Sequence, residues 1–251
     1  MPGMNIWLET HNRPLIIGHR GASMHAPENT LAAFQLAMAQ GADGIELDVK
    51  RCASGEVVVM HDATVDRTTD GAGSVHDLTL AQLRALNAGD GERVPTLDEV
   101  IELTAASAAP FLINIEVTNY STPADGLEQC VVDVVKRHAC YERILFSSFN
   151  PPGVKRLAGL LPSVPRGMLY AGNMPIFLRE VWLAPFVPHE FRHPEAGMVT
   201  PEYVARLNAQ GRRVNTWTVN SAEEIVRMTQ CGVQGIIGDS PARIKEVLGK
   251  Q

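Results

Sequence analysis

The chain has 251 residues, of which 45% are hydrophobic and 20% are charged, so it can bury a sizeable core and extended disorder is excluded. Its 22 lysines and arginines against 28 aspartates and glutamates give a formal net charge of −6, which offers no general attraction for nucleic acid or an anionic membrane. We therefore expect a small-molecule ligand that is met by a local arrangement of residues.

Short apolar runs of the kind that form buried parallel strands alternate with helix-length amphipathic segments along nearly the whole sequence. The chain begins with a strand over 14–19, a helix over 27–40 and a second strand over 44–50. Later strands are expected at 111–117, 144–149, 166–172, 187–191, 212–219 and 235–239. Helices are expected at 127–138, 154–161, 176–183 and 201–210, with another after each of the last two strands. This order makes about eight β-α units.

About eight such units in this length indicate a (β/α)8 TIM barrel, with a doubly wound open sheet as the alternative. Residues 54–95 exceed an ordinary connection between a strand and its helix and contain a further apolar run at 56–62. They predict a small insertion after strand 2, over the barrel mouth. No Pro/Ser-rich linker divides the chain, so we expect a single domain over 1–251, with its site at the carboxyl ends of the strands.

Helix boundaries are marked by local motifs. Thr79, Thr96 and Ser221 are each followed three residues later by Gln or Glu, which is the capping-box pattern, and Pro201 stands at a first-turn position. Three glycines follow predicted helices and can end them in the left-handed conformation: Gly41, Gly211 and Gly232.

Targeting and redox features favour a cytoplasmic location. The four cysteines, Cys52, Cys130, Cys140 and Cys231, form no CxxC pair of the kind that binds zinc or works as a redox couple. The N-terminal sequence lacks a basic start followed by an apolar run, and no apolar stretch approaches the ~18 residues that a membrane helix requires. We expect reduced thiols and no stable membrane insertion.

Acidic side chains gather on two of the predicted strands. Side chains alternate between faces along a strand, so Glu46 and Asp48 share one face, and Asn114 and Glu116 share the corresponding face of the next barrel strand. Carboxylates this close at a dry strand end repel one another unless a cation offsets the repulsion. Oxygen-only ligands suit Mg²⁺ or Ca²⁺ better than zinc, and the alternative is a set of structural ion pairs with Lys or Arg.

Two histidines and an arginine stand near the same mouth. His19 ends the first strand immediately before Arg20, and His61 ends the apolar run of the insertion. A pair of histidines near a carboxylate-bound cation can supply a general acid and a general base, and an arginine is a fixed bidentate donor for phosphate. Together these groups indicate phosphoryl transfer or phosphodiester cleavage.

An ordered set of motifs resembles the glycerophosphodiester phosphodiesterase family over almost the entire chain, from about Leu15 to Pro241. The first motifs are Gly18-His19-Arg20-Gly21-Ala22, Pro27-Glu28-Asn29-Thr30, Glu46-Leu47-Asp48, His61-Asp62 and Asp66-Arg67-Thr68-Thr69-Asp70-Gly71. They are followed by Val94-Pro95-Thr96-Leu97, Asn114-Ile115-Glu116, Ser147-Ser148-Phe149, Trp217-Thr218-Val219-Asn220 and Gly232-Val233-Gln234-Gly235-Ile236-Ile237.

The resemblance implies a (β/α)8 barrel with an insertion after strand 2, and hydrolysis of glycerophosphodiesters to an alcohol and sn-glycerol 3-phosphate with a divalent cation. It matches three acids to the family's metal ligands and two histidines to its acid/base pair: Glu46, Asp48 and Glu116, and His19 and His61. It also matches Arg20 to a phosphate contact and Trp217 to an aromatic residue near the glycerol. The nucleophile is either the glycerol 2-hydroxyl, giving a cyclic intermediate, or water.

One substrate-facing position departs from the family. Members usually read Glu-Ile-Lys where this chain reads Glu116-Val117-Thr118, so a hydroxyl stands where a positive charge is common. Losing one charge-assisted contact in a dry site weakens transition-state binding by ~2–4 kcal/mol. We therefore expect reduced activity or a shifted substrate choice, with Arg166 as a candidate substitute and higher turnover when Lys is introduced at 118.

Two other functions compete with the leading one. A related barrel could act on lysophospholipid or sphingolipid diesters, and the missing lysine is compatible with a weakly active phosphodiester-binding protein. The sequence leaves the headgroup, the preferred ion, the order of the two histidines and the choice between monomer and dimer open.

Overall fold

Eight parallel strands close into a barrel in the computed structural model, which describes residues 5–107, 109–119 and 125–250. The strands are β1 (Leu15–His19), β2 (Gly44–Arg51), β4 (Leu112–Val117), β5 (Ile144–Ser148), β6 (Arg166–Tyr170), β7 (Phe191–Pro194), β8 (Arg213–Thr216) and β9 (Gly235–Gly238). Because β1 pairs in parallel with both β2 and β9, the sheet has no open edge there. The predicted (β/α)8 barrel is confirmed, and the open doubly wound sheet is excluded.

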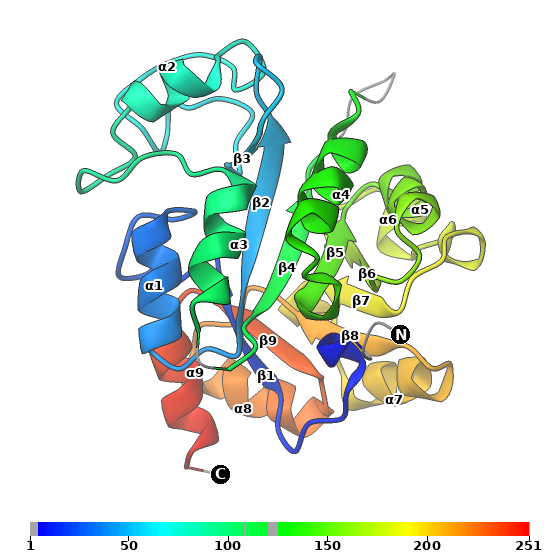
Figure 1. Cartoon of the computed structure of the whole chain (residues 1–251). Helices are drawn as coiled ribbons and strands as arrows, with labels where there is room; N and C mark the ends of the chain where they lie inside the picture. The colour runs from blue at the N-terminus through cyan, green and yellow to red at the C-terminus, as the bar shows by residue number, and fades with distance from the viewer. Residues whose placement is uncertain (1–4, 108, 120–124, 251) are drawn as a thin grey trace.

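Helices cover the outside of the barrel (Figure 1). They are α1 (Leu31–Ala39), α3 (Leu97–Ala105), α4 (Leu127–His138), α5 (Pro151–Leu160), α6 (Ile176–Arg179), α7 (Pro201–Ala209), α8 (Ala222–Cys231) and α9 (Pro241–Leu248). Capping boxes form at Thr96 and Ser221 as predicted, and Gly232 ends α8 with a left-handed φ of 79°. Within the described residues, no helix combines the length and the apolar character that crossing a membrane requires.

Several predicted boundaries differ from the structure. The first helix begins at Leu31, because Thr30 is its N-cap and accepts a hydrogen bond from the Ala33 N–H. The helix expected to reach residue 183 ends at Arg179, shortly before Val181 takes a left-handed φ of 53°. The weak strand expected at 187–191 forms instead at Phe191–Pro194, because the 3-10 helix η3 (Ala184–Phe186) and a loop occupy the preceding residues.

The insertion after β2 forms as predicted, with an apolar core of its own. Its strand β3 (Val57–Val59) runs antiparallel to the end of β2, and its helix α2 (Leu80–Ala85) begins with the capping box at Thr79. Figure 1 shows the insertion, in cyan, extending beyond the arrowhead of β2. Its core consists of Cys52, Val58, Met60, Val65, Val75, Leu83, Ala88 and Val94. The pairing with β3 fixes the carboxyl end of β2, where the candidate site begins.

The barrel interior changes from apolar to polar along its axis. At the amino-terminal end, the 3-10 helix η1 (Ile6–Leu8) inserts Trp7, which packs edge-on against Phe191 and donates to the Arg143 carbonyl at 2.9 Å. The next layer is fully buried and polar: Asn114, Ser147, His193 and Asn215. The acidic side chains lie beside them on β2 and β4, where the register pairs Glu46 with Asn114, and Asp48 with Glu116. The carboxyl ends of these strands form the mouth, where functional groups generally stand in such barrels.

Candidate active site

Three carboxylates from two neighbouring strands meet at the mouth of the barrel. The register pairs Glu46 with Asn114 and Asp48 with Glu116, so alternation along each strand directs the three acids to one side. One oxygen of each carboxylate lies within 4.8 Å of the others, and all three residues are buried. The structure therefore brings together the three acids that the sequence singles out.

The electrostatics of this cluster favour a bound cation. Burial raises the pKa of Glu46 well above its usual value, and the charges of Asp48 and Glu116 raise it further. Burial and the neighbouring Asp48 likewise raise the pKa of Glu116. Glu116 also has no hydrogen-bond or ion-pair partner in the described part of the chain. Oxygen-only donors that are buried and whose charge Arg20 offsets only in part fit a hard divalent ion.

Asn29 and Arg20 orient the carboxylates. The Asn29 side-chain amide donates to Asp48 Oδ2 at 3.0 Å, and the Arg20 backbone N–H donates to Glu46 Oε2 at 3.2 Å. Both residues have left-handed φ angles, 57° for Asn29 and 55° for Arg20, which turn the chain sharply after β1. The Pro27–Thr30 motif thus supports the acid cluster, in addition to starting α1.

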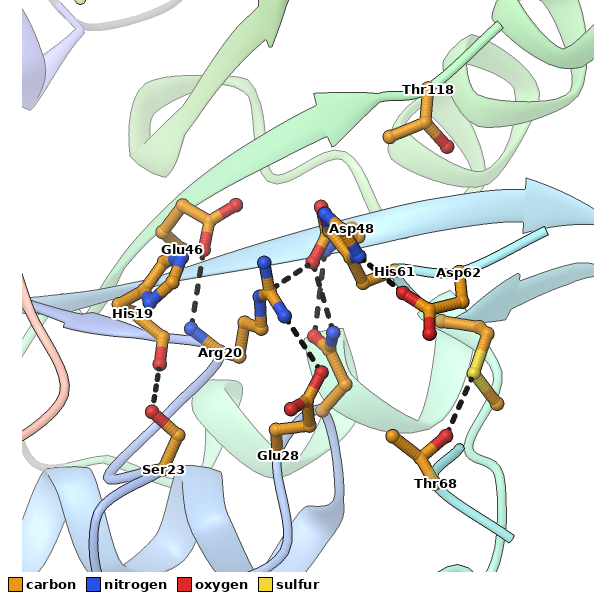
Figure 2. Close-up of polar contacts among 12 residues, drawn as sticks. His19, Arg20, Ser23, Glu28, Glu46, Asp48, His61, Asp62, Thr68 and Thr118 are labelled. Atoms are coloured by element: carbon orange, nitrogen blue, oxygen red, sulfur yellow. Dashed lines mark hydrogen bonds and ion pairs between the residues drawn. The ribbon is translucent and has the colours of Figure 1, made fainter. Parts of the chain in front are cut away.

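The Arg20 guanidinium lies between two acids (Figure 2). Its Nη1 is 2.8 Å from Glu28 Oε1, and its Nε is 3.4 Å from Asp48 Oδ2. Burial alone would raise the pKa of Glu28, but hydrogen bonds and charges from Arg67 and Arg20 lower it to about 2. Glu28 is therefore ionised at neutral pH and holds Arg20 at the edge of the cluster.

His19 is paired with an aspartate from the last barrel strand. Its Nδ1 lies 2.6 Å from Asp239 Oδ1, and Asp239 also accepts hydrogen bonds from Ser23 and Asn220. Burial alone would raise the pKa of Asp239, yet these hydrogen bonds and the His19 charge together lower it. Because Nδ1 is engaged, Nε2 is the ring nitrogen that remains for proton transfer.

His61 has a similar partner on the insertion. Its Nδ1 lies 2.6 Å from Asp62 Oδ1, and Arg67 Nε in turn lies 2.6 Å from Asp62 Oδ2. Hydrogen bonds from Arg67, followed by those from His61, lower the pKa of Asp62. His61 is the more open of the two histidines, with 42% of its side chain exposed against 19% for His19. Figure 2 shows the two histidines on opposite sides of Arg20, beside Glu46 and Asp48.

Trp217 directly follows β8, and its ring contacts are set by neighbouring residues. Its indole N–H donates to the His193 carbonyl at 2.9 Å, and its ring meets Phe149 edge-on at 5.5 Å between centroids. The ring is half-buried, so only its apolar surface is open to a ligand.

Thr118 has a partner that the sequence did not suggest. Its hydroxyl accepts a hydrogen bond from Lys50 Nζ at 2.8 Å and donates to the Val49 carbonyl at 2.8 Å. The suggestion that Arg166 replaces a missing charge here is wrong. Arg166 begins β6, at the far end of the barrel, where it binds Glu190 at 2.6 Å.

A cavity of about 250 Å³ opens beside His19. It is lined by His19, Arg20, Ser23, Met24, Glu28 and Asp239. A larger cavity of about 700 Å³ lies at the amino-terminal end of the barrel, next to Pro14 and Gln234, which precede β1 and β9. Chemistry in this fold takes place at the carboxyl ends of the strands, so we place the candidate site at the smaller cavity.

Comparison with known proteins decides the family. A model of the glycerophosphoryl diester phosphodiesterase family matches residues 19–243. The chain belongs to this family. Its enzyme class is accordingly that of the glycerophosphodiester phosphodiesterases, which are phosphoric diester hydrolases.

Relatives and solved structures resemble this phosphodiesterase along nearly its whole length. A glycerophosphodiester phosphodiesterase of Caldanaerobacter subterraneus subsp. tengcongensis is 39% identical over 246 residues, which cover 95% of this chain and 99% of the relative. The structure of an Oleispira antarctica phosphodiesterase in complex with the product sn-glycerol-3-phosphate is 29% identical, with a TM-score of 0.82 and coverage of 94% and 97% of the two chains. A glycerophosphodiester phosphodiesterase from Thermotoga maritima is 25% identical, with a TM-score of 0.75 and coverage of 94% and 100%.

Sequence reasoning missed several polar neighbours in this phosphodiesterase. It assigned no role to Asp239, Arg67 or Lys50, although each contacts a residue of the motifs that it had quoted, or to Asn220, which holds Asp239. Asp239 is the last residue of the predicted strand 235–239, so its place at a carboxyl strand end is the kind of signal that identified the other site residues. Lys50 shares the strand face of those two acids, so alternation along β2 also pointed to it.

Proposed function

We propose that this phosphodiesterase hydrolyses glycerophosphodiesters to an alcohol and sn-glycerol 3-phosphate with Mg²⁺ or Ca²⁺. The observation that carries the proposal is the group of three buried carboxylates within 4.8 Å of one another, with two histidines beside it. The complex of the Oleispira antarctica relative with sn-glycerol-3-phosphate supports the substrate class.

In this proposal Glu46, Asp48 and Glu116 hold the divalent cation. Their oxygens are already close together, and their mutual repulsion is the free-energy cost that a cation offsets. When bound, the ion supplies positive charge to the phosphoryl oxygens and so stabilises charge that develops there.

His19 and His61 carry out the proton transfers of the reaction. One of them removes a proton from the nucleophile, which is either water or the glycerol 2-hydroxyl, and the other returns a proton to the leaving alkoxide. The aspartate on each Nδ1 fixes the ring orientation and stabilises the imidazolium when it forms, as in other histidine-aspartate pairs.

Two further residues contact the substrate in this proposal. Arg20 binds the phosphoryl oxygens, because its guanidinium is held beside the carboxylates by Glu28. The exposed face of Trp217 packs on the carbon atoms of the glycerol, since its N–H is already bonded to protein. Thr118, which the sequence also assigned to the substrate, is bonded to Lys50 and to the Val49 carbonyl, so it acts on the substrate only through Lys50.

The proposal is tested by the release of glycerol 3-phosphate from glycerophosphocholine. Activity should require Mg²⁺ or Ca²⁺ and disappear in EDTA, and His19→Ala and His61→Ala should each lower kcat by about 10²- to 10⁴-fold. The exposed His76→Asn is the matched control and should leave turnover unchanged. Full activity in EDTA, or in both alanine variants, would contradict the proposed roles.

Lysophospholipids are a second candidate substrate class, favoured by exposed apolar side chains. Large exposed apolar residues of the described chain stand on connections that leave the carboxyl ends of β1 and β6: Met24, Ile176, Phe177, Trp182, Leu183 and Phe186. Such side chains suit a substrate that carries an acyl chain. A kcat/KM for lysophosphatidylcholine above that for glycerophosphocholine would favour this class, and no detectable cleavage would exclude it.

Three expectations from the sequence remain proposals. We propose that the whole chain forms one domain, that it works as a monomer or dimer on a small molecule without nucleic acid, and that it acts in the cytoplasm. A weakly active binding protein is disfavoured, because both histidines keep their aspartate partners.

A further inference from the structure

Lys50 is a buried cation beside the candidate site. It lies on β2, two residues beyond Asp48 and on the same strand face, and only 6% of the residue is exposed. Because the register pairs Val49 with Val117, the next residues along the two strands, Lys50 and Thr118, are cross-strand neighbours one step further toward the mouth. Burial lowers the pKa of the ammonium, and the negative charges of Asp48, Glu116, Asp62 and Asp125 oppose this shift.

The ammonium is held in place but not neutralised by a direct ion pair. Its Nζ donates to Thr118 Oγ1 at 2.8 Å, and the Thr118 proton is committed to the Val49 carbonyl, so the hydroxyl acts as an acceptor for Lys50. No carboxylate of the described residues lies within 4.0 Å of Nζ, and Thr118 is its one hydrogen-bond partner among them. An ammonium has three N–H donors, so two remain for an anionic ligand.

The strand that carries Lys50 is rigid at this point. Lys50 pairs with Val58 of β3 on one side, and Val49 pairs with Val117 of β4 on the other. A charge on a fixed strand, with a hydroxyl setting its direction, needs little reorganisation to meet a phosphate oxygen, and such preorganised charges stabilise transition states most effectively.

We propose that Lys50 is a phosphate-binding residue of this phosphodiesterase and that Thr118 is its positioning residue. The positive charge that Glu116-Val117-Thr118 lacks at position 118 is supplied from the neighbouring strand instead. This inference rests on the proposed function. It predicts nearly full activity for the natural chain and no gain from Lys at 118, opposite to what the sequence alone suggested.

The inference is tested by moving the charge between the two strands. Lys50→Met should lower kcat/KM for glycerophosphocholine by about 10²- to 10³-fold, which is typical for the loss of one charged donor. The Lys50→Thr, Thr118→Lys double variant should recover to within about tenfold of the wild type, because the ammonium then returns from position 118 to the same space. Thr118→Lys alone should not raise turnover, because it places a second ammonium beside that of Lys50, and the two repel each other. The exposed Lys155→Met is the matched control and should match the wild type.

A second measurement does not depend on turnover. Binding of sn-glycerol 3-phosphate to the metal-free protein, measured by calorimetry, should weaken about tenfold or more in Lys50→Met and about three- to tenfold in Thr118→Val, which keeps the side-chain volume but cannot accept the hydrogen bond. If Lys50→Met does not fold, Thr118→Val and Lys50→Arg decide the question, with Lys50→Arg retaining most of the binding.

The outcomes separate this inference from the proposed function. A wild type that cleaves no glycerophosphodiester contradicts the proposed function, while weaker product binding in Lys50→Met still supports the phosphate-binding role. An active wild type with Lys50→Met within twofold of it in both kcat/KM and product affinity overturns the inference alone. A tenfold gain in turnover from Thr118→Lys also overturns it.

Discussion

Each of the two histidines at the mouth depends on a carboxylate behind it. Asp239 lies 2.6 Å from His19 Nδ1 and is itself held by Asn220, so the His19 ring has one orientation and one tautomer. Asp239→Asn removes the charge and allows the wrong tautomer, so we expect kcat to fall by about 10²- to 10⁴-fold with little change in KM.

The control for this prediction is Ser23→Ala. Ser23 also touches Asp239, at 3.2 Å, but it does not contact the His19 ring, so its loss should cost less than tenfold in kcat. Steady-state kinetics over a range of pH measure both variants. An Asp239→Asn enzyme with the wild-type kcat and the wild-type pH profile would show that His19 does not need its partner.

At the residue scale, strand alternation selected the acids from the sequence, and a position at the end of a strand or apolar run selected the histidines. Alternation identified Glu46, Asp48 and Glu116 because they lie on paired strands, where the backbone alone decides which side chains share a face. The pairing of Asp239 with His19 and that of the Asn29 amide with Asp48 could not be predicted in this way, because these contacts join segments far apart in the chain through irregular turns with left-handed residues. Lys50 was overlooked because a lysine on a buried strand is uncommon.

At the scale of single elements, the start of α3 offers a clean test of local stability. The Thr96 hydroxyl accepts a hydrogen bond from the Glu99 N–H, and the Glu99 carboxylate accepts one from the Thr96 N–H at 2.8 Å. Thr96→Ala should lower the free energy of unfolding by about 1 kcal/mol, while Thr96→Ser should retain most of it. Urea unfolding measures both variants, and an unchanged stability in Thr96→Ala would contradict the role of the cap. Activity should be unaffected, because the cap does not contact the site.

Strand β7 and the loop before it make the fold sensitive to acid. Burial lowers the pKa of His193 to about 3 and that of His189 to about 4, from 6.5 for a free histidine. In both cases the unfolded chain binds the proton more readily, so this stability is present above pH 6.5 and is lost as the pH falls toward these values. Between pH 6 and 5 each histidine should reduce the unfolding free energy by about 1 kcal/mol per pH unit.

His193→Asn isolates one of these contributions. Whatever it does to stability at pH 7.5, it should remove about 1 kcal/mol per pH unit from the slope of unfolding free energy between pH 6 and 5. The surface variant His76→Asn controls for the mere loss of a histidine. A slope in His193→Asn equal to that of the wild type would mean that His193 is not buried in the neutral form.

Elements that are determined by neighbouring residues in the sequence were predicted more accurately than elements that are determined by pairing with distant strands. The capping boxes at Thr79, Thr96 and Ser221 mark helix starts because the cap and its partner are three residues apart. Strand β7 was misplaced by several residues, since its short buried segment is defined by pairing with β6 and β8, and a segment of this kind carries no periodicity of its own.

At the scale of the whole molecule, we expect the acid cluster to couple folding to cation binding. Burial and mutual repulsion raise the pKa of Glu46 and Glu116, so the metal-free barrel becomes less stable as the pH rises above about 4.5, and a bound cation should reverse this. At a concentration 100-fold above its Kd, Mg²⁺ or Ca²⁺ should raise Tm by roughly 5–10 °C. Glu116→Gln should be more stable than the wild type without metal and should gain less from it. An equal gain in both proteins would argue against binding at this cluster.

The most direct test of the account is a calorimetric titration of Mg²⁺, and then of Ca²⁺, into the metal-free protein, alongside the Glu46→Gln, Asp48→Asn, Glu116→Gln triple variant. We predict that the wild type binds one ion per chain and releases protons as it does so, because carboxyls with a raised pKa lose their protons when the cation binds. The folded triple variant should bind no ion. A wild type that binds neither ion at millimolar concentration, yet still cleaves glycerophosphocholine in EDTA, would contradict it.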